Sequence, residues 1–116
     1  AEPLLLFFTY HFLNNDGDEY QKIRKATSEL IKNVKGAYSI AMIHRDSLIL
    51  IRDPYCYRPF VYAYDNNLFV ASSESIVLNS LGFSNIEEML GGAFAIIKPK
   101  KQGYEIKIER LKLMML

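Results

Sequence analysis

The sequence has 116 residues, of which 50% are hydrophobic and 23% are charged, with a formal net charge of +1 and a single cysteine. This composition is typical of one ordered globular domain and excludes a disordered chain, and the near-zero charge argues against a nucleic-acid partner. The longest apolar runs are too short to span a membrane, and one cysteine cannot form an internal disulfide, so we expect a cytoplasmic protein.

Two helices are predicted at the start of the chain. Residues 2–13 are apolar nearly all round, which is typical of a buried helix. Residues 20–34 place apolar side chains at three- and four-residue spacing and charged ones mostly on the other face, which predicts an amphipathic helix. Asp16 or Asp18 is expected to cap this second helix, and Gly36 to end it.

After the second helix, the pattern changes to short runs rich in β-branched and aromatic residues, which predicts strands. Asp65-Asn-Asn67 is expected to form a tight hairpin. Ser72 or Ser73 is expected to cap a short helix that runs through Leu81, with Glu74 near its positive end. The six predicted strands are 37–43, 47–51, 60–64, 68–72, 93–98 and 104–108.

Two of these strands, 47–51 and 93–97, are apolar on both faces instead of alternating. A strand buried on both faces needs a covering layer on each side. Most connections are too short for parallel crossovers, so we expect antiparallel sheets. A stack of helix, sheet, sheet and helix meets both demands. We therefore predict an α+β sandwich of this kind, with the helices on the outer faces, which 116 residues only partly complete.

The most informative segment is Leu50-Ile-Arg-Asp-Pro-Tyr-Cys-Tyr-Arg-Pro-Phe60, where two prolines bracket an aromatic loop between apolar strands. Arg52, Asp53 and Arg58 can border a substrate pocket. Alternatively, they form a structural arginine–aspartate pair that anchors the loop, because a buried aspartate needs a partner. We favour the structural interpretation. Likewise, the segment 72–75 can begin a phosphate-binding helix, but a plain N-cap explains it fully.

The remaining candidates for catalysis or ligand binding are few. A thiol nucleophile needs a base within reach, and neither His11 nor His44 lies near Cys56 in the sequence, so we expect an ordinary loop cysteine. The histidines lack a metal-ligand spacing, and Gly91-Gly92 lacks the pattern of a nucleotide loop. We therefore predict no catalytic residue, no metal and no cofactor in this chain.

Several segments resemble class II glutamine amidotransferase domains, most closely those of amidophosphoribosyltransferases. Gly36-Ala-Tyr-Ser-Ile40 is similar to the family's GAYS strand, and residues 50–60 are similar to its RDPYG-RPL loop. Residues 71–75 resemble its ASES helix start with one serine inserted or substituted, and residues 91–97 lie where the family has a PGE turn and strand. Cys56 replaces the glycine of the loop. If that glycine has a positive φ, Cys56 carries backbone strain.

The resemblance implies the N-terminal-nucleophile hydrolase fold, a four-layer αββα sandwich, in which residues 1–116 form the C-terminal portion of one glutaminase domain. In this family an N-terminal cysteine attacks glutamine, and the ammonia passes to a phosphoribosyltransferase domain that uses phosphoribosyl pyrophosphate for purine biosynthesis. Glutamine and the preceding half of the domain are therefore the implied partners, with room for a homo-oligomer. The chain itself would supply scaffold and pocket support. The alternative is a non-catalytic homologue that acts in binding or assembly.

Overall fold

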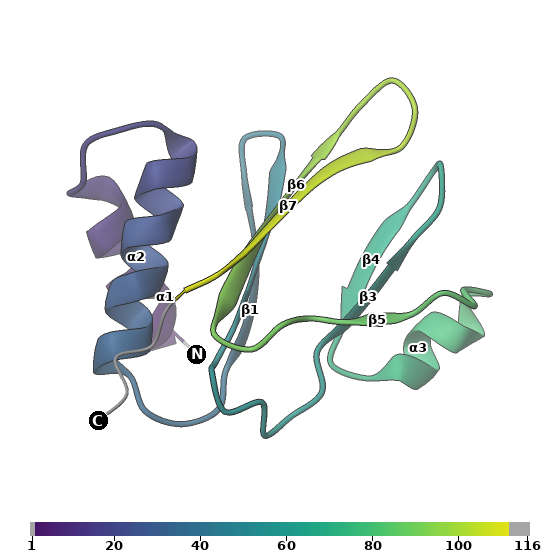
Figure 1. Cartoon of the computed structure of the whole chain (residues 1–116), viewed down its shortest axis with the longest axis horizontal. Helices are drawn as coiled ribbons and strands as arrows, with labels where there is room; N and C mark the ends of the chain where they lie inside the picture. Colours follow the sequence, from purple (N-terminus) through teal and green to yellow (C-terminus); the bar gives the residue numbers. More distant parts are fainter. Residues whose placement is uncertain (1, 112–116) are drawn as a thin grey trace.

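The computed structural model describes residues 2–111, which form a stack of four layers. Figure 1 shows α1 and α2 against the sheet β1-β2-β6-β7, then the sheet β4-β3-β5, and α3 on the far side. All strand pairs are antiparallel, so the predicted α+β sandwich is confirmed. The elements are α1 (Glu2–Leu13), α2 (Glu19–Asn33), β1 (Ser39–His44), β2 (Ser47–Arg52), β3 (Val61–Tyr64), β4 (Phe69–Ser72), α3 (Ser75–Ser80), β5 (Glu87–Glu88), β6 (Ala93–Pro99) and β7 (Tyr104–Arg110). Among residues 2–111, none of the helices meets the length and hydrophobicity that a membrane span requires.

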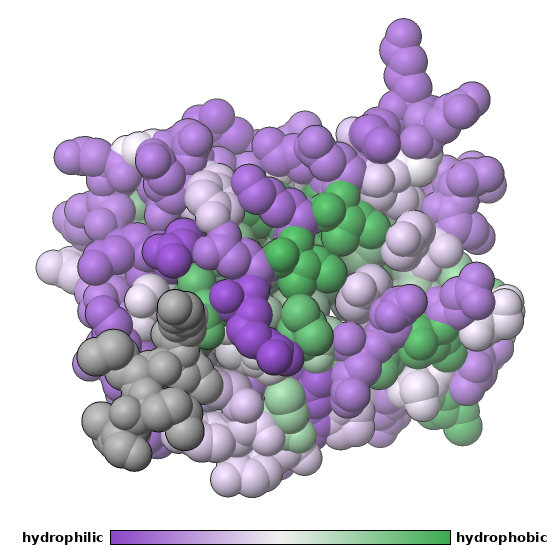
Figure 2. Space-filling model, in the orientation of Figure 1, coloured by the Kyte–Doolittle hydropathy of each residue, from purple (hydrophilic) through white to green (hydrophobic). Residues whose placement is uncertain are grey.

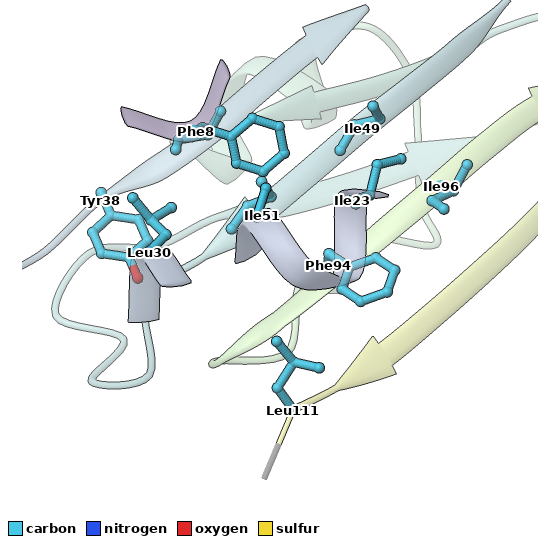
Figure 3. Close-up of a cluster of buried hydrophobic side chains, with 11 residues drawn as sticks. Phe8, Ile23, Leu30, Tyr38, Ile49, Ile51, Phe94, Ile96 and Leu111 are labelled. Atoms are coloured by element: carbon cyan, nitrogen blue, oxygen red, sulfur yellow. The ribbon is translucent and has the colours of Figure 1, made fainter. Parts of the chain in front are cut away.

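Three clusters of buried side chains fill the three spaces between the layers. The first lies between the helices and the first sheet (Figure 3), the second between the sheets, and the third between the second sheet and α3. Strand β2 gives Ile49 and Ile51 to the first core and Leu50 to the second. Because successive side chains of a strand point to opposite faces, this explains why β2 is apolar throughout.

Helix α2 begins as predicted but ends earlier. The Asp18 carboxylate accepts a hydrogen bond from the Gln21 N–H at 2.9 Å, and the Gln21 side chain accepts one from the Asp18 N–H, which completes a capping box. The helix ends at Asn33, and Val34 already has an extended backbone. The prediction that Gly36 ends α2 is therefore wrong. Its φ of +114° belongs to the connection to β1.

The cap of α3 also differs from the prediction. The helix begins at Ser75, and Glu74 occupies the N-cap position without a side-chain capping bond. Neither Ser72 nor Ser73 caps it, because both lie before the N-cap residue. Instead, the Ser72 hydroxyl accepts a hydrogen bond from the Glu74 N–H at 3.0 Å and stabilises the turn that leads into the helix.

Candidate functional site

The candidate site is the loop 53–60, which carries the chain from β2 of the first sheet to β3 of the second. It contacts the turn before β6. There the Gly92 N–H donates to the carbonyl oxygens of Arg52 at 3.0 Å and of Asp53 at 3.2 Å. Two segments almost 40 residues apart in the sequence thus meet at one corner of the sandwich, and both belong to motifs that the sequence singled out.

Arg52 joins the two sheets at this corner. Its side chain is only 2% exposed, and its guanidinium donates to the carbonyl oxygens of Met89 and Arg58, both at 2.6 Å. The neighbouring carboxylate belongs to Glu88, at 3.4 Å, and that side chain is 67% exposed. A buried guanidinium held mainly by carbonyl oxygens fixes β5 and the loop relative to β2. Neither of these carbonyl partners could be identified from the sequence.

Asp53 organises the loop from inside. Its carboxylate is 1% exposed and accepts three backbone N–H groups, from Tyr38 at 3.1 Å and from Tyr55 and Cys56 at 2.9 Å. The predicted arginine–aspartate pair is therefore wrong, because amides take the place of the guanidinium as partners of the buried carboxylate. Arg58 contributes its carbonyl oxygen, and its side chain is exposed. The loop is anchored as expected, but by different bonds.

Tyr38 completes this corner, and the sequence had identified it only as part of the GAYS-like strand, not as a neighbour of Asp53. Its side chain is 7% exposed, and its hydroxyl has no hydrogen-bond partner within residues 2–111. Burial, and next the charge of Asp53, raise the pKa of Tyr38, so its phenol stays neutral at pH 7. Tyr38 packs in the core between the helices and the first sheet.

Cys56 replaces the glycine of the family loop and has a positive φ. Its φ is 56°, and its side chain is exposed. A Cβ added at Gly91 would lie 2.3 Å from the Cys56 sulfur, so a side chain at Gly91 would force the sulfur to move. The His44 side chain forms a hydrogen bond with Glu19, and His11 lies on α1. The geometry therefore offers Cys56 no histidine base.

A second polar cluster ties the start of α2 to the first sheet. The Glu19 carboxylate contacts His44 Nδ1 at 2.6 Å, the Ser47 hydroxyl at 3.1 Å and Lys98 Nζ at 3.2 Å. The carboxylate lies between serine and histidine, so this is not the order of a nucleophile–base relay. An open groove of about 480 Å³ with both acidic and basic side chains lies beside it. Within residues 2–111, no three potential metal ligands come together.

Comparison with known proteins gives one consistent result. Residues 10–80 match a family described as glutamine amidotransferase domain. An amidophosphoribosyltransferase of Pyrococcus horikoshii is 30% identical over 98 residues, which is 84% of this chain and 20% of that protein. One of Archaeoglobus fulgidus is 32% identical over 87 residues, 75% of this chain and 18% of that protein. The chain thus spans about a fifth of the length of these curated relatives.

Solved structures agree on the fold. A Bacillus subtilis glutamine phosphoribosylpyrophosphate amidotransferase, complexed with ADP and GMP, superposes with a TM-score of 0.72 at 21% identity. The match covers 89% of this chain and 21% of that one. A structure described as the allosteric regulatory enzyme of purine biosynthesis gives a TM-score of 0.68 at 20% identity, over 84% of this chain and 20% of that one. These matches confirm the N-terminal-nucleophile hydrolase fold.

Proposed function

The chain belongs to the class II glutamine amidotransferase domains, and on that premise we propose that residues 1–116 form the C-terminal portion of a glutaminase domain. In this role the chain supplies scaffold and pocket support, and the preceding portion of the domain supplies the cysteine nucleophile. The observation that carries the proposal is the family match over residues 10–80, because it includes the loop that Arg52 and Asp53 hold in place.

The reaction that we propose for the complete protein is release of ammonia from glutamine and its transfer to phosphoribosyl pyrophosphate in a second domain, as a step of purine biosynthesis. The shared name of the relatives, amidophosphoribosyltransferase, supports this acceptor. The proposal also places the protein in the cytoplasm, where an unpaired cysteine is the ordinary state. A homo-oligomer is compatible with it.

Arg52 and Asp53 act as positioning residues in this proposal. Between them they bind the carbonyl group of Met89, which follows β5, and carbonyl and amide groups of the loop 53–60 and of the segment that leads into β1. A pocket wall built on this corner is held from inside the protein, without help from a ligand. Rigid support of this kind is what a catalytic site needs to keep its reacting groups in place.

The test is glutamine-dependent ammonia release by the complete natural polypeptide that contains this chain, with and without phosphoribosyl pyrophosphate. We expect release by the complete polypeptide and none by the 116-residue chain alone. Cys56→Ser is the matched control and should leave the release unchanged, because Cys56 is not the nucleophile. A folded complete polypeptide that releases no ammonia would instead identify a non-catalytic homologue that acts in binding or assembly.

A further inference from the structure

Gly91 lies at the corner where the loop 53–60 meets the turn before β6 (Figure 1). A Cβ built at this position would lie 2.3 Å from the Cys56 sulfur, and 3.3 Å from the carbonyl oxygens of both Asp53 and Pro54. Non-bonded heavy atoms prefer a separation of about 3.5–4.0 Å, so small shifts relieve the two carbonyl contacts but not the contact with the sulfur. The sulfur is therefore the main obstacle to a side chain at residue 91.

The backbone conformation of Gly91 does not itself require glycine. Gly92 has a φ of +63°, whereas Gly91 is not among the residues with a positive φ. A side chain is strained only in that left-handed region. Glycine is thus needed at residue 91 for the space that it leaves open. An alanine placed there reports on the contact with the loop and not on backbone strain.

The turn that contains Gly91 is held from two sides. The Gly92 N–H donates to the carbonyl oxygens of Arg52 at 3.0 Å and of Asp53 at 3.2 Å, and the Gly92 carbonyl accepts the Leu111 N–H at 2.9 Å. Gly92 is buried, so this backbone has little room to shift. A side chain added at residue 91 would therefore displace the loop rather than the turn.

The outer side of the loop gives it little support within residues 2–111. Residues 55–59 are all exposed. Figure 2 shows mostly pale and hydrophilic residues along the lower edge of the molecule, where Figure 1 places the connection from β2 to β3. The position of the loop is thus set from beneath, by the hydrogen bonds of Asp53 and by the contact with the turn at Gly91 and Gly92.

We propose that Gly91 is a positioning residue of the glutaminase pocket, because positions 56 and 91 share a space that holds one side chain only. Cys56 fills this space, and the missing side chain of Gly91 lets the loop 53–60 lie directly on the turn before β6. The amidotransferase motifs have the reverse arrangement, with glycine in place of Cys56 and proline in place of Gly91. The role in the pocket rests on the proposed function, whereas the shared space rests on the geometry alone.

Hydrogen exchange of the Gly92 amide tests the shared space in the complete natural polypeptide. Gly91→Ala should accelerate this exchange by about 10-fold or more, because the added methyl group pushes the loop and its carbonyl acceptors away. Combining Gly91→Ala with Cys56→Ala should return the rate to within about 3-fold of the natural protein, because alanine lacks the sulfur. Alkylation of Cys56, followed by mass spectrometry, should be about 5-fold faster in Gly91→Ala, because the displaced sulfur turns toward solvent.

Two variants serve as controls. Cys56→Ala alone should change the Gly92 exchange by less than about 3-fold. Gly103→Ala is the matched glycine variant, because Gly103 has a φ of +77° and a Cβ there would meet no atom within 4 Å. It adds backbone strain without a contact, so it should accelerate exchange in the hairpin β6–β7 and not at Gly92. Unchanged Gly92 exchange in Gly91→Ala would overturn the proposal, and so would fast exchange that persists in the combined variant.

The role in the pocket is tested by glutamine-dependent ammonia release, at a temperature at which all variants are folded. Gly91→Ala should lower kcat/KM for glutamine by about 10-fold, and the combined variant should recover most of this loss. The loss should appear mainly in KM, because the pocket wall moves while the nucleophile of the preceding portion keeps its surroundings.

The outcomes separate this inference from the proposed function. Accelerated Gly92 exchange with unchanged kinetics in Gly91→Ala would support the shared space and overturn the role of Gly91 in the pocket. A natural polypeptide that releases no ammonia, but whose variants show the expected exchange pattern, would overturn the glutaminase function and leave the shared space supported.

Discussion

The backbone conformation of Cys56 is set by hydrogen bonds to Asp53 and not by the conformational preference of cysteine. The Asp53 carboxylate accepts the N–H groups of both Tyr55 and Cys56, and this turn holds Cys56 at a φ of 56°. In that left-handed region, Cβ approaches the backbone too closely, at a cost of about 1–2 kcal/mol for residues other than glycine. The loop therefore keeps its shape in spite of the cysteine.

Replacing Cys56 by glycine should stabilise the protein. Cys56→Gly relieves the strain, but the unfolded chain gains conformational freedom, so we expect a net increase of about 0.5–1 kcal/mol in the free energy of unfolding. Cys56→Ala keeps the Cβ and is the control, with a change below about 0.5 kcal/mol. Urea denaturation of the three proteins measures both values. If glycine gave no gain over alanine, the left-handed turn would not be strained.

At the scale of elements, Glu19 connects the first turn of α2 to the hairpin β1–β2 and to β6 through His44, Ser47 and Lys98. Burial alone raises the pKa of Glu19. The hydrogen bonds from these three side chains outweigh it, so the pKa in the folded protein lies below the ordinary value of 4.5. The charged carboxylate therefore stabilises the fold.

This shift predicts a pH dependence of stability. A carboxyl group whose pKa is lowered by folding contributes its full stability above the unfolded pKa, near 4.5, and loses it as the pH falls through the lower folded pKa. Glu19→Gln should reduce the free energy of unfolding by about 1–2 kcal/mol at pH 7 and flatten its decline between about pH 5 and pH 3. Urea denaturation across this range measures the slope. An unchanged slope in the variant would mean that other carboxylates dominate it.

Elements set by local signals could be predicted from the sequence. The Asp18 capping box lies within four residues, and the Asp65 carboxylate accepts the N–H groups of Asn67 and Leu68 in the expected hairpin. Strand β5 could not be predicted, because Glu87–Glu88 has no strand pattern. It pairs with β3 next to the Met89 carbonyl, which the side chain of Arg52 holds. Local hydrogen bonds can be predicted because their partners lie at a fixed spacing in the sequence, whereas the partners of long-range bonds do not.

At the scale of the whole molecule, the four layers could be predicted from the sequences of β2 and β6, because a strand that is apolar on both faces needs a covering layer on each side. The corner that joins the sheets was predicted only in part. The sequence predicted that Arg52, Asp53 and Arg58 anchor the loop, but it expected the buried aspartate to pair with an arginine. In the structure Arg52 and Asp53 each bind the backbone of other segments, and a backbone partner carries no residue type by which a sequence could reveal it.

Arg52 should therefore contribute more to the contact between the two sheets than to the stability of its own strand, β2. Its guanidinium reaches two carbonyl oxygens at once, on the segments at Met89 and Arg58, and the single ammonium group of a lysine cannot copy that fork. We expect Arg52→Lys to lower the free energy of unfolding by about 2–4 kcal/mol, because a buried charge is left with fewer partners.

The loss of stability in Arg52→Lys should also differ between segments of the protein. The Met89 N–H bonds to the Phe60 carbonyl next to this guanidinium, so its hydrogen exchange should accelerate more than that of the hairpin β1–β2. Glu88→Gln is the matched control, and because Glu88 is mostly exposed, it should change stability by less than about 0.5 kcal/mol. Uniform acceleration across both sheets would mean that Arg52 supports the core in general. If the acceleration is confined to β5 and the loop 53–60, Arg52 is the residue whose hydrogen bonds hold the second sheet against the first.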